Sequence, residues 1–247
     1  MRYRITIWLM IVHSVAFSQD WKPARISEKD GYALLREGQG KEFAVVDSIK
    51  ADEYFYCKSS DSEWWAVQHA YHGRLSGYIH KSRICLLESL PLKEMQNVIM
   101  TVFIKQEELA KEFVKSLAKI DKKTNNWKTE KDSVSNIESG RIKEIHSETH
   151  YNPILDILPL YYCRTKDTSV IIQLYKTLWT DGGSANEAPA WALGYCFVCE
   201  PELTSLSLKS LPNEIKEKAK GMIAFGLNNV CKTREEEMKL NEILDTN

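Results

Sequence analysis

The sequence predicts an α+β protein of two domains, with a small β domain followed by an all-helical one. Short runs rich in β-branched and aromatic residues, separated by turn residues, fill residues 20 to about 88. From residue 91 onward, apolar residues instead recur at three- and four-residue steps, which is the period of amphipathic helices. A chain of 247 residues with 43% apolar content is long enough for two such cores.

The first 18 residues have the three parts of a secretory signal peptide. Two arginines precede an apolar stretch at residues 5–12, and Ala16-Phe17-Ser18 places small residues at the −3 and −1 positions of a cleavage site. A membrane anchor is the alternative, but a span needs about 20 apolar residues, and His13 and Ser14 interrupt this run. We expect cleavage before Gln19, leaving a chain without a membrane span in the periplasm or the medium.

Charge and cysteine content narrow the function classes. The net charge of −1 is mixed along the chain, which argues against a nucleic-acid partner because phosphate binding needs excess Lys and Arg. Export permits disulfides among the six cysteines. Cys57 and Cys85, both on predicted strands, are one candidate pair. Cys196 and Cys199 form a CxxC late in an apolar run, which favours buried structural cysteines over redox chemistry and leaves one disulfide to either of them open.

In the β domain, assigned to residues 19–88, four strands stand out. They are 43–46, 54–57, 64–67 and 77–79, with turn residues between them at 37–40, 59–62 and 72–74. Because side chains alternate along a strand, only one of two adjacent tryptophans can point inward. We expect Trp65 to point inward with Val67, and Trp64 to point toward the surface.

The helical half divides at prolines, glycines and polar stretches. Residues 89–120 predict one amphipathic helix or a broken pair, 121–141 a polar surface connection, and 142–247 a helical domain. Within that domain the predicted helices are 154–163, which Pro159 kinks or splits, then 168–179, 189–199, 212–230 and a last helix opened by the capping box at Thr233. The helix pairs are compatible with HEAT-like stacking.

Three segments carry a family resemblance: Ala33-Leu34-Leu35-Arg36-Glu37-Gly38, Ser62-Glu63-Trp64-Trp65-Ala66-Val67, and Gly77-Tyr78-Ile79 followed by Ile84. In this order and spacing they resemble the bacterial SH3 (SH3b) family over about residues 24–87. The usual Pro after the Arg-x-Gly turn is Gln39 here, the Gly of the middle turn is replaced at Ala51-Asp52, and Ser62-Glu63 replaces the Gly before the tryptophans.

The resemblance implies a small SH3-like β-barrel that binds cell-wall peptides or glycan strands. Aromatic side chains near its groove would supply stacking area. The candidates are Tyr32, Tyr54, Tyr56, Trp64 and Tyr78. The alternative for each of them is a packing role in the core.

No set of residues in the sequence predicts catalysis or a cofactor. His146 and His150 are four residues apart and would share a helix face, as in a two-His metal site, but no third ligand can be named and the alternative is a solvated helix end before Pro153. A cysteine-peptidase arrangement is excluded for the helical half because every cysteine there follows the last histidine, His150. The residues Asp181-Gly182-Gly183-Ser184 are interpreted as an interhelical turn.

The sequence therefore favours an exported, non-enzymatic binding protein, whose barrel engages a cell-wall peptide or glycan, or a protein, with the helices as a scaffold. Two alternatives stay open. One is an exported enzyme with an unrecognised hydrolase site in the helical half, and the other is a structural or assembly partner of an envelope complex. The oligomeric state is open as well.

Overall fold

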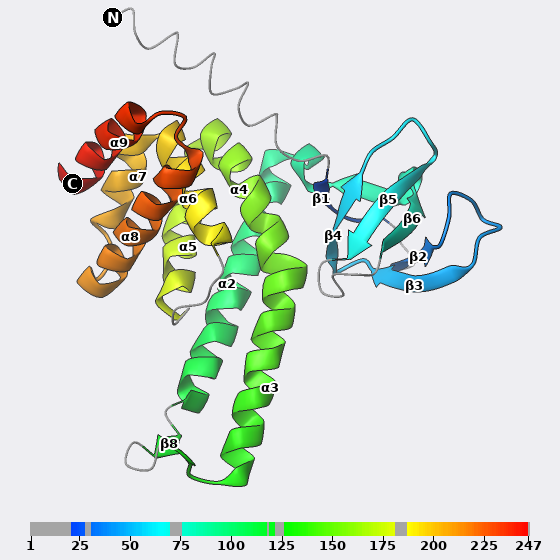
Figure 1. Ribbon diagram of the computed structural model, residues 1–247, viewed down its shortest axis with the longest axis horizontal. Helices are drawn as coiled ribbons and strands as arrows, with labels where there is room; N and C mark the ends of the chain where they lie inside the picture. Colours follow the sequence, from blue (N-terminus) through cyan, green and yellow to red (C-terminus); the bar gives the residue numbers. More distant parts are fainter. Residues whose placement is uncertain are drawn as a thin grey trace, which may run out of the picture.

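The computed structural model describes residues 21–27, 31–69, 76–117, 119–121, 126–180 and 187–246. In it, an antiparallel sheet is followed along the chain by a group of helices (Figure 1). The sheet order is β3-β2-β6-β5-β4-β1-β7. The strands are β1 (Lys22–Ile26), β2 (Tyr32–Arg36), β3 (Val45–Lys50), β4 (Tyr54–Lys58), β5 (Trp64–His69), β6 (Ser76–His80) and β7 (Ile84–Leu86). The predicted α+β class is confirmed. The sheet is open, with β3 and β7 as its edges, so the closed barrel is not confirmed.

One surface of the curved sheet encloses its own small core. The buried members of this core are Ala24, Ile26, Ala33, Leu35, Ile49, Phe55, Cys57, Val67 and Ile79. Trp65 packs against them, half-buried, whereas Trp64 does not belong to the cluster. The predicted orientation of the tryptophan pair is therefore confirmed, and it follows from the two-residue period of a strand.

The helices begin with a long hairpin. Its arms are α2 (Leu92–Leu117) and α3 (Glu130–His146), and a two-strand ribbon, β8 (Ile120–Asp121) with β9 (Asn126–Trp127), lies at its tip. The hairpin projects beyond both the sheet and the remaining helices (Figure 1). Those helices are α4 (Asn152–Thr165), α5 (Thr168–Thr180), α6 (Ala188–Cys199), α7 (Pro201–Leu208), α8 (Asn213–Val230) and α9 (Arg234–Thr246).

The helices predicted after residue 150 are confirmed, and residues 92–117 form a single helix rather than a broken pair. Thr233 caps the last helix as predicted, since its hydroxyl accepts a hydrogen bond from the Glu236 N–H at 3.2 Å. The Glu236 carboxylate accepts from the Lys232 N–H at 3.1 Å and not from that of Thr233, so the reciprocal bond of a capping box is displaced by one residue. The expected surface connection over 121–141 is wrong from residue 130 onward, where α3 begins. The Thr129 hydroxyl caps this helix by accepting from the Asp132 N–H.

Helix α3 continues into α4 through one π-helical turn, Ser147–Tyr151, in which the Asn152 N–H donates to the Ser147 carbonyl. The helical run is unbroken from Glu130 to Thr165, and Pro159 lies inside it. The solvated helix end expected before Pro153 is therefore wrong. A π turn inserts one extra residue per turn and rotates the side chains that follow it.

The helical core extends into the sheet. Tyr54 of β4 belongs to the same apolar cluster as Met95 and Ile99 of α2 and Tyr151 of the π turn. Arg25 of β1 forms an ion pair with Glu94 of α2. Two separate domains are thus not confirmed, because the β4-β1-β7 half of the outer sheet surface packs on helices.

Two predicted segments lie outside the described residues: the signal segment 1–18 and the turn at Asp181–Ser184. Among the helices that the structure describes, none is both long enough and apolar enough to cross a bilayer.

Candidate ligand-binding surface

The outer surface of strands β2, β6 and β5 carries three of the five aromatic candidates: Tyr32, Trp64 and Tyr78. In the sheet register Trp64 lies opposite His80, and Tyr78 lies between Ala66 and Arg36. Trp64 and Tyr78 are diagonal neighbours on adjacent strands, a relation that places their Cα atoms about 7–8 Å apart and their rings within reach. Tyr32, which is 48% exposed, lies four residues before Arg36, roughly 13 Å away along β2.

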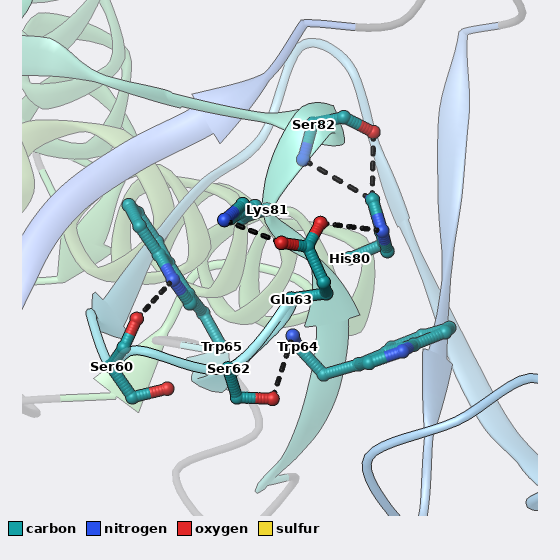
Figure 2. A network of polar contacts seen from close by, with 8 residues as sticks. All are labelled: Ser60, Ser62, Glu63, Trp64, Trp65, His80, Lys81 and Ser82. Carbon is teal, nitrogen blue, oxygen red and sulfur yellow. Dashed lines mark hydrogen bonds and ion pairs between the residues drawn. The ribbon is translucent and has the colours of Figure 1, made fainter.

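Trp64 is held in place by its neighbours. Its backbone N–H donates to the Ser62 hydroxyl at 3.1 Å, and its ring meets the His80 ring edge-on, with centroids 5.4 Å apart. Figure 2 shows the two indoles on opposite sides of β5, with Trp65 donating its Nε1–H to the Ser60 carbonyl at 3.2 Å. An ordered, half-buried indole of this kind loses little conformational entropy when a ligand stacks on it.

A charged network positions His80. The Glu63 carboxylate lies 2.7 Å from Lys81 Nζ and 3.4 Å from His80 Nε2 (Figure 2), and the hydrogen bond from Lys81 lowers the pKa of Glu63. His80 Nδ1 accepts from the Ser82 N–H at 3.4 Å. The neutral ring therefore carries its proton on Nε2, facing Glu63. His80 was not among the predicted site residues, although strand alternation places it on the same face as Tyr78.

Arg36 supplies a cation beside Tyr78. Its Nη1 donates to the carbonyls of Lys41 at 3.0 Å and Phe43 at 2.7 Å, so one edge of the guanidinium holds the β2–β3 loop. Guanidinium groups present five donors in a planar fork, and these two bonds use only one nitrogen. The site therefore combines two aromatic rings with a positive group that is fixed by the loop.

Tyr54 and Tyr56 lie on β4, where helices cover the sheet. Tyr54 is 9% exposed and its ring meets that of His150 at 5.4 Å. The Tyr56 hydroxyl donates to the Asp156 carboxylate at 2.8 Å, and burial, together with that carboxylate, raises the pKa of Tyr56. Tyr54 joins the sheet to the π turn and Tyr56 joins it to α4, so neither side chain belongs to the candidate surface.

The two candidate metal ligands, His146 and His150, stack on each other rather than converging on one point. Their rings are 5.0 Å apart and nearly parallel. His146 Nδ1 lies 2.8 Å from the Gln106 side-chain oxygen, and His150 Nε2 lies 2.7 Å from the Asp52 carbonyl. No cluster of three metal-ligating side chains occurs within the described ranges. His150 thereby fixes the β3–β4 turn to the π turn.

The disulfide of the structure is not the candidate pair Cys57–Cys85. Cys57 and Cys85 are both free, so the predicted bridge between them is wrong. Strand β1 lies between β4 and β7, where Cys57 pairs with Lys22 and Cys85 pairs with Arg25, three residues farther along β1. The two cysteines are therefore more than two strand spacings (about 10 Å) apart, whereas a disulfide needs Cα atoms within about 7 Å. A disulfide instead joins Cys163 of α4 to Cys199 of α6, and burial raises the pKa of the other CxxC thiol, Cys196.

Comparison with known proteins does not identify a family for this chain. No family model, no curated protein and no solved structure matches the chain. The resemblance to bacterial SH3 domains thus depends on the three sequence motifs and stays a prediction.

Proposed function

We propose that the chain is an exported, non-enzymatic binding protein whose open sheet surface engages a peptide or glycan strand of the cell wall, with the helices as a scaffold. The observation that carries the proposal is the pairing of Trp64 and Tyr78 on the outer surface of β5 and β6, with Arg36 next to Tyr78. Aromatic faces bind sugar rings and peptide planes by stacking, and a guanidinium binds a carboxylate through paired hydrogen bonds.

The placement of the motifs supports an SH3-like module. The Leu35-Arg36 segment ends β2, the tryptophan pair begins β5, and Gly77 and Tyr78 lie on β6 between them. Position 77 requires glycine, because a Cβ there would lie 2.5 Å from the Arg36 carbonyl oxygen. Only glycine allows β6 to approach β2 this closely, and that approach brings Tyr78 beside Arg36.

The Cys163–Cys199 disulfide supports export. It joins two helices that are 36 residues apart in sequence. Disulfides persist in the periplasm and outside the cell and are rare in the reducing cytosol. This observation is independent of the signal-peptide pattern and agrees with it.

The first prediction tests the binding surface. Purified mature protein should co-sediment with isolated cell-wall material. Trp64→Ala should weaken this binding about 30-fold, because truncating a central aromatic anchor costs about 2 kcal/mol. The matched control is Trp191→Ala, which removes an indole that is 44% exposed on α6, far from the sheet. This control should bind like the wild type.

Two outcomes count against the proposal. One is equal retention of Trp64→Ala and wild type by the wall material, with circular dichroism showing both folded. The other is an equal loss in the two tryptophan variants, which would indicate non-specific adhesion through exposed indoles.

Arg36→Lys separates charge from geometry, because lysine keeps the charge but cannot form the planar fork.

A further inference from the structure

Helix α3 presents its apolar side chains to solvent. Val134 is 57% exposed, Ile137 67% and Ile142 42%, and Ile145 is half-buried. With 3.6 residues per turn, these four positions lie on one side of the helix, and Glu138 and Arg141 share that side. We call this set the α3 stripe; its members are Val134, Ile137, Glu138, Arg141, Ile142 and Ile145.

The opposite side of α3, which packs on α2, is polar. The Asn136 amide donates to the Ser116 hydroxyl of α2 at 2.7 Å, and Ser139 donates to the same hydroxyl at 3.2 Å. Gly140 allows Phe113 of α2 to pack closely, since a Cβ there would be 3.1 Å from its ring. A helix that packs by an apolar stripe normally buries that stripe. Here the buried side is polar and the apolar side is open, which marks an interaction surface.

The order of residues in the α3 stripe is symmetric about the point between Ser139 and Gly140. The steps along it are three, one, three, one and three residues, with apolar side chains at the outside and one charge of each sign at the centre. A second α3 lying antiparallel, with a two-fold axis at that point, places Glu138 against Arg141 of the second copy and Ile137 against Ile142 of the second copy. Val134 then meets Ile145 of the second copy.

We propose that the α3 stripe is a homodimer interface, formed by two copies of this chain packed antiparallel through α3. Charge complementarity selects this occupant. The antiparallel arrangement makes two Glu138–Arg141 pairs, whereas a parallel, in-register arrangement sets Glu138 against Glu138 and Arg141 against Arg141. Neither residue has an ion-pair partner within the part of the chain that the structure describes. A two-fold interface of this kind uses the same surface on both subunits.

The interface is short. It covers about three helical turns, so it is smaller than the roughly 1,600 Å² of standard stable complexes. The dimer is therefore in equilibrium with monomer, and the full mature chain should show a concentration-dependent mass in sedimentation equilibrium.

The test is a charge exchange. Glu138→Arg alone and Arg141→Glu alone each set like charges against each other twice, so each variant should be monomeric where the wild type dimerises. The double variant E138R/R141E exchanges the partners and should dimerise again. An equimolar mixture of the two single variants should form a heterodimer, because one copy then carries two arginines and the other two glutamates.

An apolar variant and a matched control complete the test. Ile137→Ser should give a monomer, and Ile104→Ser, on the exposed side of α2 at 44% exposure, should leave the dimer unchanged. Both sites are exposed, so folding is retained in each. A wild-type chain that is monomeric at every concentration overturns the proposal, as does dimerisation of the single charge variants, or cross-linking of the stripe to a different protein only.

Discussion

At the scale of single residues, His146 is the clearest case of a side chain whose environment changes its chemistry. Burial, then the charges of His150 and Lys105, lower the pKa of His146 from 6.5 to about 4. Above pH 6.5 the ring is neutral in both the folded and the unfolded chain. As the pH falls from 6.5 toward 4, the unfolded chain binds the proton first, so folding loses stability over this window and no further below it.

The second prediction follows from this shift. Between about pH 7.5 and about pH 5 the titration of His146 should remove about 2 kcal/mol from the free energy of unfolding. In His146→Gln, which cannot titrate, the loss over the same range should be smaller by that amount, as measured by urea denaturation of both proteins. Equal losses in the two proteins would show that His146 is not the responsible group.

Residue-level prediction succeeded where it depended on strand alternation. The period of two placed Trp65 toward the core and Trp64 outside, and the structure agrees. The same period cannot distinguish Tyr54 and Tyr56 from Tyr78, since all three leave the sheet on its outer surface. What separates them is the packing of α4 on β4, a contact between segments about 100 residues apart that no local pattern records.

At the scale of elements, the α6–α8 contact depends on glycine. Gly194 and Gly226 lie at the crossing, where a Cβ on Gly226 would overlap the Ala190 carbonyl oxygen and one on Gly194 would be 2.7 Å from the Gly226 carbonyl carbon. The glycines let the two helix backbones approach closely. This contact orders α8 against the core around Leu193 and Ile223.

The third prediction compares two glycines of the same helix. Gly226→Ala should destabilise the protein by about 1–3 kcal/mol or more, because the overlap is with backbone that cannot move alone. Gly221→Ala, where no atom lies within 4 Å, should stabilise it by up to about 1 kcal/mol through helix propensity. Thermal unfolding followed by circular dichroism measures both, and a neutral Gly226→Ala would mean that α8 shifts freely.

Elements with a strong apolar period were predictable and α3 was not. Helices α5, α6 and α8 bury apolar residues at three- and four-residue steps, and their sequence limits came close to the observed ones. Helix α3 packs through Asn136 and Ser139 and leaves its apolar residues outside. Its sequence therefore has the composition of a surface connection, and its partners on α2 are about 20 residues away.

At the scale of the whole molecule, the disulfide and the proposed export belong together. The Cys163–Cys199 bridge closes a loop of 36 residues between α4 and α6. By restricting the unfolded chain, a bridge that closes a loop of this length adds about 3–4 kcal/mol to the free energy of unfolding. A chain folded in a reducing compartment lacks this contribution.

The fourth prediction uses one mass measurement on protein collected after export. In denaturant and without reduction, thiol blocking should label four cysteines, namely Cys57, Cys85, Cys196 and Cys231. The denaturant is needed because Cys57 and Cys196 are buried in the folded chain. The chain should begin near Gln19, as the signal pattern predicts. Cys163→Ser should lower the free energy of unfolding by about 3–4 kcal/mol and make it insensitive to reductant. Labelling of all six cysteines in the exported protein would contradict the bridge.

The division into two domains was the least predictable feature at this scale. The change of period near residue 90 is real, because the sheet ends with β7 and α2 begins at Leu92. Yet Tyr54, Leu87 and Leu90 are buried in the helical core, and Arg25 contacts Glu94 across the boundary. A boundary in the sequence pattern marks a change of secondary structure, and only the packing shows whether the two cores are separate.

The unbroken helix from Glu130 to Thr165 acts as a rigid rod that sets distances within the molecule. Its 36 residues span roughly 54 Å at about 1.5 Å per residue. In the proposed dimer the axis passes near residue 139, and His150 meets the sheet about 16 Å farther along each copy. The two His150–Asp52 contacts would then lie about 30 Å apart along the rod, with one sheet attached near each end. If the proposed sheet surface and the proposed dimer both hold, the dimer would be a divalent receptor, and it would retain a long polymer better than a short one because only a long polymer reaches both surfaces at once.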